Sequence, residues 1–510
     1  MASLLELSHE LLHCIFTEIE PADLSALSLT CRSLHSYISG NKLLHKDLYL
    51  RQYDQPTNAE LQWEDALHKL VKLDKLLSSE ERAVKYEHLG FVAEQINGLL
   101  EHTKPDADTS ANIRLLADHF ADTTNIDAFL CASGLFERAG GEYQTAAGSE
   151  ELRQASAKLH CMYGVPIDEL PSRSSFHIYR PDVHLSPSSC TRQQSKPYLT
   201  HTFARSKVYD LRQYTDDTLW GPFRDDGTQR VDWEKVEAIM IVLGFNLRKF
   251  TERSDGRFPL IWDEPFVGAT PRSYMSPAPI ADPSREKEMD EDMLKIRSLA
   301  LNLDAQDPYG VSGTWMRVVC FLDYNDLYAF NFSNPGYPKD QPRQPIDTEE
   351  GMVLIQEIVC SLSPLQSADS CCVWAAIRLI RVKWQVTKIE PPGSHNEDDE
   401  ETGGSMEDWS QFKGTRLPVV HFQGTSRSLH ASWDPNANSK IRGEFIVSIR
   451  AVGFGLRTDV ERGTVRQTPE GEIRWTTFSI FHGEERWRSE GIQVGGIRSA
   501  RGVLGNWFDK

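Results

Sequence analysis

Apolar residues in the first 50 positions recur at steps of three and four, the spacing of one face of an α-helix. Ser8 can cap a helix that ends before Pro21, and Asp23 stands where a second helix starts. Gly40 and Asn41 then break the pattern before a last short apolar stripe. Three short helices contain too few residues to bury their own apolar faces, so we expect an exposed stripe. Its residues are Leu7, Leu11, Ile15, Leu24, Leu27 and Leu34.

Helical spacing continues over residues 54–170, and one more helix is predicted from Val231 to Phe245. Between them, residues 171–200 are rich in Ser, Pro and Arg, a composition typical of a linker. Two stretches near 263–295 and 393–410 are rich in prolines or acidic residues and are predicted to be flexible loops. The predicted segments are therefore 1–50, 54–170, 171–200 and 201–510.

Strand-like runs dominate the chain from about residue 297. Trp315–Leu322 is typical of a buried strand, and Asp323–Asn331 follows it closely. Val373–Ile389 supplies further strands, and a turn at Pro469–Gly471 before Ile473–Phe481 predicts a hairpin. Several strands without a regular helix between them indicate an antiparallel sandwich or a barrel-like sheet. The expected fold class is α+β, with helices in the N-terminal part and a β-rich C-terminal domain.

Composition limits what such a chain can do. Its 510 residues indicate two or three domains. The net charge of −19 argues against general nucleic-acid binding, which needs a basic surface. The sequence has no run of 18 apolar residues and no basic-then-apolar N-terminus, so we expect neither a membrane span nor a secretory signal. Nine cysteines without a C-x-x-C pair indicate reduced thiols in the cytoplasm or the nucleus.

His9, Glu10 and His13 spell the H-E-x-x-H signature of zinc proteases. On a helix, both histidines fall on the polar face, one turn apart, opposite the leucines. Zinc chemistry needs a third protein ligand, and the following stretch offers none in a recognisable setting. A solvated helix face is therefore the favoured interpretation, and a zinc-dependent hydrolase is the alternative.

The same 50 residues resemble the F-box family. The resemblance rests on the Asp-Leu-x-x-Leu segment at Asp23–Leu27 and on the pair Cys31-Arg32. The sequence departs from the family at Ser8, where a proline is usual, although serine also starts a helix well. The resemblance implies docking on a Skp-type adaptor of a cullin–RING ubiquitin ligase, and the alternative is docking on the rest of the chain. The implied adaptor-binding residues are Leu7, Leu11, Ile15, Leu24, Leu27, Cys31 and Leu34.

Residues 300–510 resemble the C-terminal region of F-box proteins from filamentous fungi. Those proteins usually continue a little further, so we expect either residues beyond Lys510 or a sheet that closes differently. If this domain binds a target protein, aromatic residues are expected to line its pocket. The segments that carry the resemblance are Pro435–Gly443, Arg474-Trp475, Gly483–Trp487, Ser489–Gly496 and Gly505–Phe508. The candidate target-binding residues are Trp315, Tyr324, Trp475 and Trp487.

No phosphate-binding loop, dinucleotide-binding loop or G-x-S-x-G elbow is present, and no carboxylates pair convincingly. His160 and Cys161 are adjacent and point in different directions, which indicates a structural role. We therefore predict a non-catalytic receptor subunit without cofactor or metal. A ligase-independent scaffold is a further alternative. Residues 444–463 are either an ordinary insertion or a retained intron, because their removal joins Ile441–Gly443 to Thr464–Arg466 in one strand.

Overall fold

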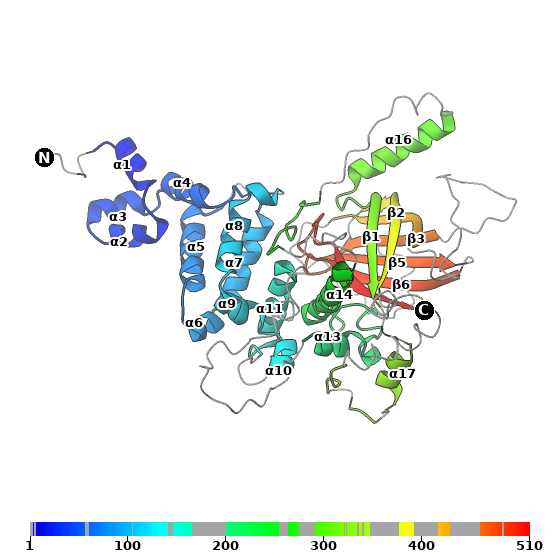
Figure 1. Cartoon of the computed structure of the whole chain (residues 1–510). Coiled ribbons are helices and arrows are strands. Elements are labelled where there is room, and N and C mark those ends of the chain that lie inside the picture. The colour runs from blue at the N-terminus through cyan, green and yellow to red at the C-terminus, as the bar shows by residue number, and fades with distance from the viewer. Residues whose placement is uncertain are drawn as a thin grey trace, which may run out of the picture.

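The architecture follows the order of the sequence, with helices first and a sheet last (Figure 1). It comes from a computed structural model of the whole chain. The structure describes residues 4, 7–56, 61–104, 106–140, 146–165, 200–253, 264–274, 291–320, 322, 324–333, 336–338, 341–346, 377–391, 417–428, 460–481 and 484–509. Residues 171–199 of the predicted linker and the predicted loop at 393–410 lie outside these residues, as does Trp374 of the predicted strand region, while Thr200 is the first residue of α13.

The first helices enclose a small core of their own. Ser8 caps α1 as predicted, since its hydroxyl accepts a hydrogen bond from the Leu11 amide at 3.5 Å. Pro21 opens a short 3-10 turn, η2, that leads into the second helix. The core residues are Leu12, Phe16, Leu24, Leu34, Ile38, Leu44 and Leu48. The elements are α1 (His9–Phe16), η2 (Pro21–Asp23), α2 (Leu24–Ser28), α3 (Arg32–Ile38) and α4 (Lys42–Gln52).

A second group of helices continues this core. The end of α4 is joined to α8 by Asp54, a buried carboxylate that accepts hydrogen bonds from the Ser110 hydroxyl at 2.6 Å and the Ala111 amide at 3.1 Å. The Ala111 amide is the first of α8, so the carboxylate lies at the N-terminus of that helix, beside its cap Ser110. The elements are α5 (Trp63–Leu77), α6 (Arg82–Glu87), α7 (Leu89–Glu101), η3 (Ala107–Thr109), α8 (Ala111–His119), α9 (Thr123–Asn125), η4 (Ile126–Leu130), α10 (Gly134–Gly140) and α11 (Glu150–Tyr163).

Helix α14 joins the helical part to the sheet. The helix predicted from Val231 to Phe245 is present, although it begins and ends later, at Trp233–Arg253. It packs on α11 and α13 on one side and contacts β1, β2 and β7 on the other. Residues 291–295, predicted to belong to a loop, form the first turn of α16. The remaining helical elements are α13 (Thr200–Val208), η6 (Leu211–Gln213), α16 (Glu291–Gln306) and α17 (Tyr324–Phe332).

The C-terminal domain is a seven-stranded antiparallel sheet whose strands pair in chain order. This confirms the predicted antiparallel architecture and the α+β class. The predicted hairpin is also present: the Thr468 amide donates to the Glu472 carbonyl at 2.7 Å across the turn. The strands are β1 (Gly313–Cys320), β2 (Ile377–Glu390), β3 (Val419–Ser428), β4 (Val460–Gln467), β5 (Ile473–Phe481), β6 (Glu484–Gln493) and β7 (Val503–Asp509).

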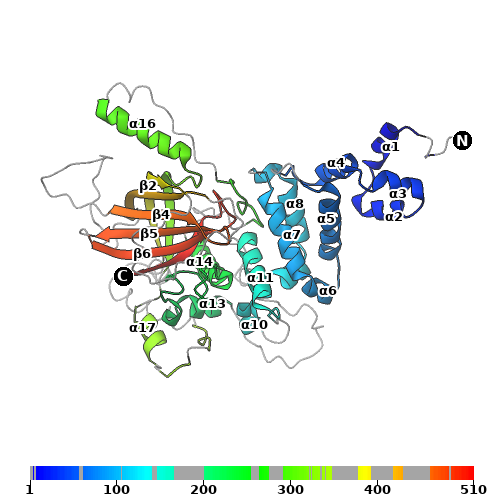
Figure 2. The ribbon, with the colours of Figure 1, turned by 180° about the vertical axis from the view of Figure 1, so that it is seen from behind.

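The sheet curves until strands far apart in its order face each other. In a flat sheet, β1 and β5 are four strand spacings apart, about 19 Å. Here the rings of Trp315 on β1 and Trp475 on β5 have centroids only 5.2 Å apart. The sheet is therefore a nearly closed barrel, and Figure 2 shows its strands wrapped around a common interior, with helices α1 to α4 at the far end.

Two expectations for this domain are wrong. Asp323–Asn331, expected among the strand-like runs, is for the most part helix α17, which the side chain of Asn331 ties to the carbonyl of Tyr209 at 3.0 Å. Tertiary contacts outweigh the strand preference of its aromatic residues. Residues 460–463 are part of β4, so the segment 444–463 is not wholly an insertion into the fold. Residues 444–459 lie outside the described residues.

Candidate functional site

Helix α1 exposes one row of apolar side chains and buries another. Leu12 and Phe16, one turn apart, are 6% and 1% exposed and face the small N-terminal core. Leu11 and Ile15, also one turn apart, are 53% and 42% exposed and point away from it. A helix of eight residues cannot bury both rows against three neighbouring short helices, so one row is left for solvent or a partner.

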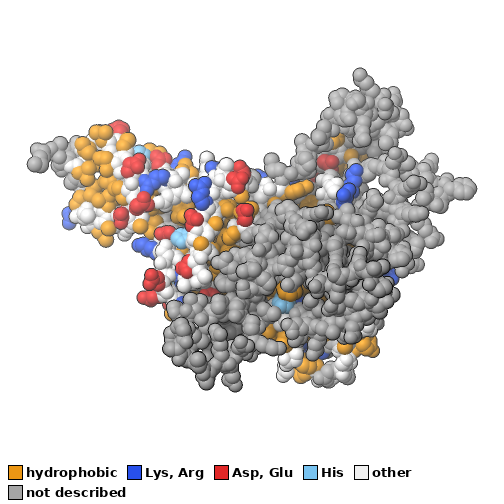
Figure 3. All heavy atoms as spheres, in the orientation of Figure 1, with side chains coloured by type: hydrophobic (Ala, Val, Ile, Leu, Met, Phe, Trp, Pro, Cys, Tyr) orange, Lys and Arg blue, Asp and Glu red, His pale blue; other side chains and the backbone are white. Residues whose placement is uncertain are grey.

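The exposed apolar surface extends beyond the residues that the sequence predicted. Leu29 and Leu43 are 82% and 59% exposed, at the end of α2 and the start of α4. Neither was among the predicted adaptor-binding residues, although Leu43 belongs to the last apolar stripe that the sequence shows. Figure 3 shows hydrophobic side chains gathered over this end of the molecule. We call Leu11, Ile15, Leu29 and Leu43, with the half-buried Leu7, Leu27 and Cys31, the N-terminal apolar surface.

Two predicted surface residues do not belong to it. Leu24 and Leu34 are 3% and 6% exposed and pack in the core that holds α1 to α2 and α3. Apolar spacing identifies a helix face, but it does not distinguish the side that meets the chain's own core from the side left open. Both residues support the surface from beneath and do not form it.

The side chains of the H-E-x-x-H residues do not point toward a common position where a metal ion could bind. The His13 side chain is engaged, since its Nε2 lies 2.9 Å from an Asp47 carboxylate oxygen on α4. The exposed His9 ring packs beside Tyr37, with centroids 5.6 Å apart. Among the described residues, no third ligand joins these two histidines. The part of the chain that the structure describes thus offers no zinc site to this segment, and the His13 side chain instead holds α1 against α4.

The N-terminal helices match a known family of domains. The F-box-like family matches residues 7–51, the span of α1 to α4. The chain carries an F-box-like domain. No curated protein and no solved structure matches the chain. F-box domains bind Skp-type adaptors, and F-box proteins are generally non-catalytic receptor subunits. The resemblance of residues 300–510 to fungal proteins stays a prediction, because the match ends at residue 51.

The aromatic residues predicted to bind a target divide into separate groups. Trp315 and Trp475 meet Trp384 inside the barrel, with ring centroids 5.2 to 5.7 Å apart. Trp475 is 2% exposed and its indole N–H donates to the Gln493 side chain at 3.1 Å, so it belongs to the core of the sheet domain. The expectation that Trp475 lines an accessible pocket is therefore wrong in this structure.

Trp487 and Tyr324 lie apart from that core. Trp487 on β6 stacks on Trp507 of β7, with centroids 4.2 Å apart. Tyr324 is the first residue of α17, and the structure does not describe its side chain. Trp487 therefore does not share the enclosed site of Trp315 and Trp475, because strand periodicity cannot show which aromatic rings a curved sheet encloses.

A largely buried ion pair crosses the barrel interior, with the Arg317 and Glu461 side chains 16% and 2% exposed. The Arg317 guanidinium on β1 donates to both Glu461 carboxylate oxygens on β4, at 2.8 and 3.3 Å. The Trp384 indole N–H and the Ser479 hydroxyl donate to the same carboxylate at 3.1 and 3.4 Å. Glu461 therefore joins β1, β2, β4 and β5, which are not all neighbours in the sheet. Sequence patterns gave no sign of this pair, since its partners are 144 residues apart.

A second buried polar group lies between α11 and α14. Glu237 accepts a hydrogen bond from the Ser133 hydroxyl at 2.6 Å and lies 2.8 Å from His160 Nδ1. Burial lowers the pKa of His160 to about 3 and raises that of Glu237 well above its usual range. The carboxyl, not the imidazole, stands between the other two, and all three side chains are fully buried. This order and this burial do not suit a hydrolase triad, so the group holds α11 against α14.

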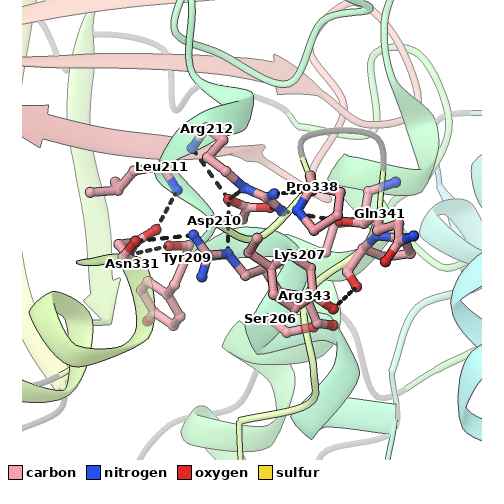
Figure 4. Close-up of polar contacts among 12 residues, drawn as sticks. Ser206, Lys207, Tyr209, Asp210, Leu211, Arg212, Asn331, Pro338, Gln341 and Arg343 are labelled. Carbon is pink, nitrogen blue, oxygen red and sulfur yellow. Dashed lines mark hydrogen bonds and ion pairs between the residues drawn. The ribbon is translucent and has the colours of Figure 1, made fainter. Parts of the chain in front are cut away.

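Helix α17 is held in place by a third polar group, shown in Figure 4. Asp210, which is 1% exposed, accepts from Arg212 Nε and Nη2 at 2.8 and 2.7 Å. Asn331 of α17 donates to the Tyr209 carbonyl at 3.0 Å and accepts from the Leu211 amide at 3.0 Å. Arg343 donates to the carbonyl of Asn331, also at 3.0 Å. The end of α17 is therefore fixed to the segment that follows α13.

The helix that this group fixes carries an exposed aromatic pair. Tyr328 and Phe332 are one turn apart, 55% and 54% exposed, with ring centroids 5.0 Å apart. Leu211, whose backbone amide donates the hydrogen bond to Asn331, adds a third apolar side chain, which is 42% exposed. We call these three residues the α17 patch. Figures 1 and 2 place α17 at the opposite end of the molecule from α1.

Proposed function

We propose that the protein is the substrate-recognition subunit of a cullin–RING ubiquitin ligase. The N-terminal apolar surface binds a Skp-type adaptor, and through it a cullin–RING scaffold, while the C-terminal domain binds a target protein. The chain forms and breaks no bond itself. It acts by proximity, because holding the target near the charged conjugating enzyme raises the effective concentration of the target's lysines. We propose that it does so in the cytoplasm or the nucleus.

The observation that carries this proposal is the surface of the F-box-like domain. Four leucine and isoleucine side chains of this domain are each more than two-fifths exposed, although the same helices bury a complete core beneath them. Such a surface on a short helical domain is typical of a site that binds a groove or a helix of a partner protein. Within the described residues, no helix combines the length and hydrophobicity needed to cross a bilayer.

The direct test is a reconstitution with purified full-length chain and a purified Skp-type adaptor. We expect a one-to-one complex by size-exclusion chromatography with light scattering, and addition of the cullin N-terminal region should give a larger complex. Separate elution of chain and adaptor would contradict the proposal. An adaptor complex that excludes the cullin would instead support the ligase-independent scaffold.

We further propose that the target contacts the α17 patch. The patch lies at the end of the molecule opposite the F-box-like domain, so a bound target leaves the adaptor surface free (Figure 1). Paired exposed aromatic residues on a rigidly held element are typical of interface anchors, because they bury a large area at a small entropic cost. The polar group of Asp210, Arg212 and Asn331 supplies that rigidity.

Replacing Tyr328 and Phe332 by serine should remove target proteins from affinity purifications made with the proteasome inhibited. Both side chains are exposed, so the fold and adaptor binding should persist while target recovery falls by about tenfold or more. Quantitative mass spectrometry of the purified complexes measures this. The matched control is Leu299→Ser, a 60% exposed residue on α16. Equal target recovery from the double variant and the control would rule out the α17 patch.

A further inference from the structure

Three potential metal ligands converge where the F-box-like domain meets the helical region. His45 comes from α4, the last F-box helix, while Glu64 and His68 come from α5, the first helix after it. Within the described part of the chain, ligand atoms of these three residues lie within 4.8 Å of one another. The sequence predicted no metal here, since His45 is 19 residues from Glu64 and no compact motif links them.

His45 presents a lone pair that no hydrogen bond uses. Its Nδ1 lies 2.9 Å from the Asn41 carbonyl, which can only accept, so Nδ1 carries the proton. Nε2 is then an acceptor, and it is buried without a hydrogen-bond partner. The whole residue is 0% exposed. A carbonyl bonded to one ring nitrogen is also the usual way in which proteins orient a histidine that binds metal through the other.

The two α5 residues complete the site from a more open side. Glu64 and His68 are four residues apart and so lie on one face of the helix. One Glu64 oxygen accepts a hydrogen bond from the Gly40 amide at 3.0 Å, which orients the carboxylate and leaves its other oxygen available. His68 is exposed and its ring lies edge-on to that of His45, with centroids 6.0 Å apart. An ion can therefore enter from solvent and reach the buried nitrogen.

We propose that His45, Glu64 and His68 bind a divalent transition-metal ion of the zinc class. Two imidazoles and a carboxylate are preferred zinc donors, with a water as the fourth ligand. Zinc–ligand bonds of about 2.1 Å require donor atoms about 3.4 Å apart. Rotation of the accessible Glu64 and His68 side chains closes the remaining distance.

The bound ion joins α4 to α5 and so ties the F-box-like domain to the rest of the chain. The same two helices also pack through Tyr49 and Trp63, whose rings are 5.4 Å apart. The metal therefore acts as a structural clamp that fixes the direction in which the adaptor surface faces relative to the C-terminal domain. This inference does not depend on the identity of the adaptor or of the target.

Cobalt binding by the full chain, purified without a polyhistidine tag, tests the site. We expect one Co²⁺ per chain with the visible absorption bands of a four-coordinate nitrogen–oxygen site, displaced by Zn²⁺. His68→Ala removes an exposed ligand and should weaken binding by about 100-fold or more. The matched control is His9→Ala, an exposed histidine of α1, which should bind as the wild type does. Equal cobalt binding by the wild type and His68→Ala would overturn the proposal, as would no binding by either.

Hydrogen exchange of the α4 and α5 amides provides a local second measurement. At a Zn²⁺ concentration about 100 times the dissociation constant, openings that separate the two helices should become about 100-fold rarer. The wild type should show this protection and Glu64→Gln with His68→Ala should not. Zinc protection that is the same in both proteins would show an ion bound elsewhere and would overturn the assignment.

Discussion

The full chain carrying Leu11→Asp and Ile15→Asp should lose its adaptor, with binding weakened by at least about 100-fold, or about 3 kcal/mol. Both side chains are exposed, at 53% and 42%, and neither belongs to the buried core, so the free chain should keep its fold. In the complex, however, two carboxylates would have to leave water for an apolar interface, which is strongly unfavourable without a paired charge. Biolayer interferometry against an immobilised Skp-type adaptor measures the loss.

The matched control for this variant is Leu301→Asp on α16, which is 42% exposed, as Ile15 is. It changes the net charge in the same direction at a distant site and should leave adaptor binding unchanged. Leu27 is a less suitable partner for Leu11, because it is half-buried against the core and an aspartate there would also disturb the fold. Adaptor binding by the Leu11 and Ile15 variant at wild-type strength would show that another surface makes the contact.

Glu461→Ala should destabilise the C-terminal domain by about 3–5 kcal/mol, because it leaves Arg317 charged in the barrel interior without its partner. The Trp384 indole and the Ser479 hydroxyl lose an acceptor at the same time. Chemical denaturation followed by tryptophan fluorescence reports this directly, since three indoles lie in the same interior.

A paired variant separates the charge effect from the loss of packing. Arg317→Met with Glu461→Leu removes both charges and should recover much of the lost stability. For comparison, Asp65→Ala breaks an exposed ion pair with Lys69 on α5 and should leave the free energy of unfolding nearly unchanged, because solvent screens that pair. A Glu461→Ala protein as stable as the Asp65→Ala protein would contradict the role of this pair in closing the barrel.

The F-box-like domain could be predicted because its pattern is local. Ser8, Pro21 and Asp23 mark helix ends through interactions within one turn, and apolar spacing identifies a helix face without knowledge of its partner. The antiparallel sheet was predictable for a similar reason, since strand runs and the turn at Pro469–Gly471 are also local signals. These features need no information on which distant segments meet.

The features that escaped prediction all depend on long-range contacts. The sequence could not show that Leu24 and Leu34 face the core while Leu29 and Leu43 face solvent. It could not show that the curved sheet encloses Trp475, or that Arg317 finds its partner 144 residues away. The helical state of α17 likewise depends on hydrogen bonds to the segment after α13. In each case the sequence supplies the residue type, and the fold decides its neighbours.

We propose that one end of this chain binds the ligase and the other end binds the target. Affinity purification with the proteasome inhibited, followed by quantification of ubiquitin remnants on co-purified proteins, tests it most directly. The wild type should recover a target that carries ubiquitin, and the Leu11→Asp, Ile15→Asp variant should recover the same target without ubiquitin. Equal ubiquitin modification of that target in both purifications would contradict the account.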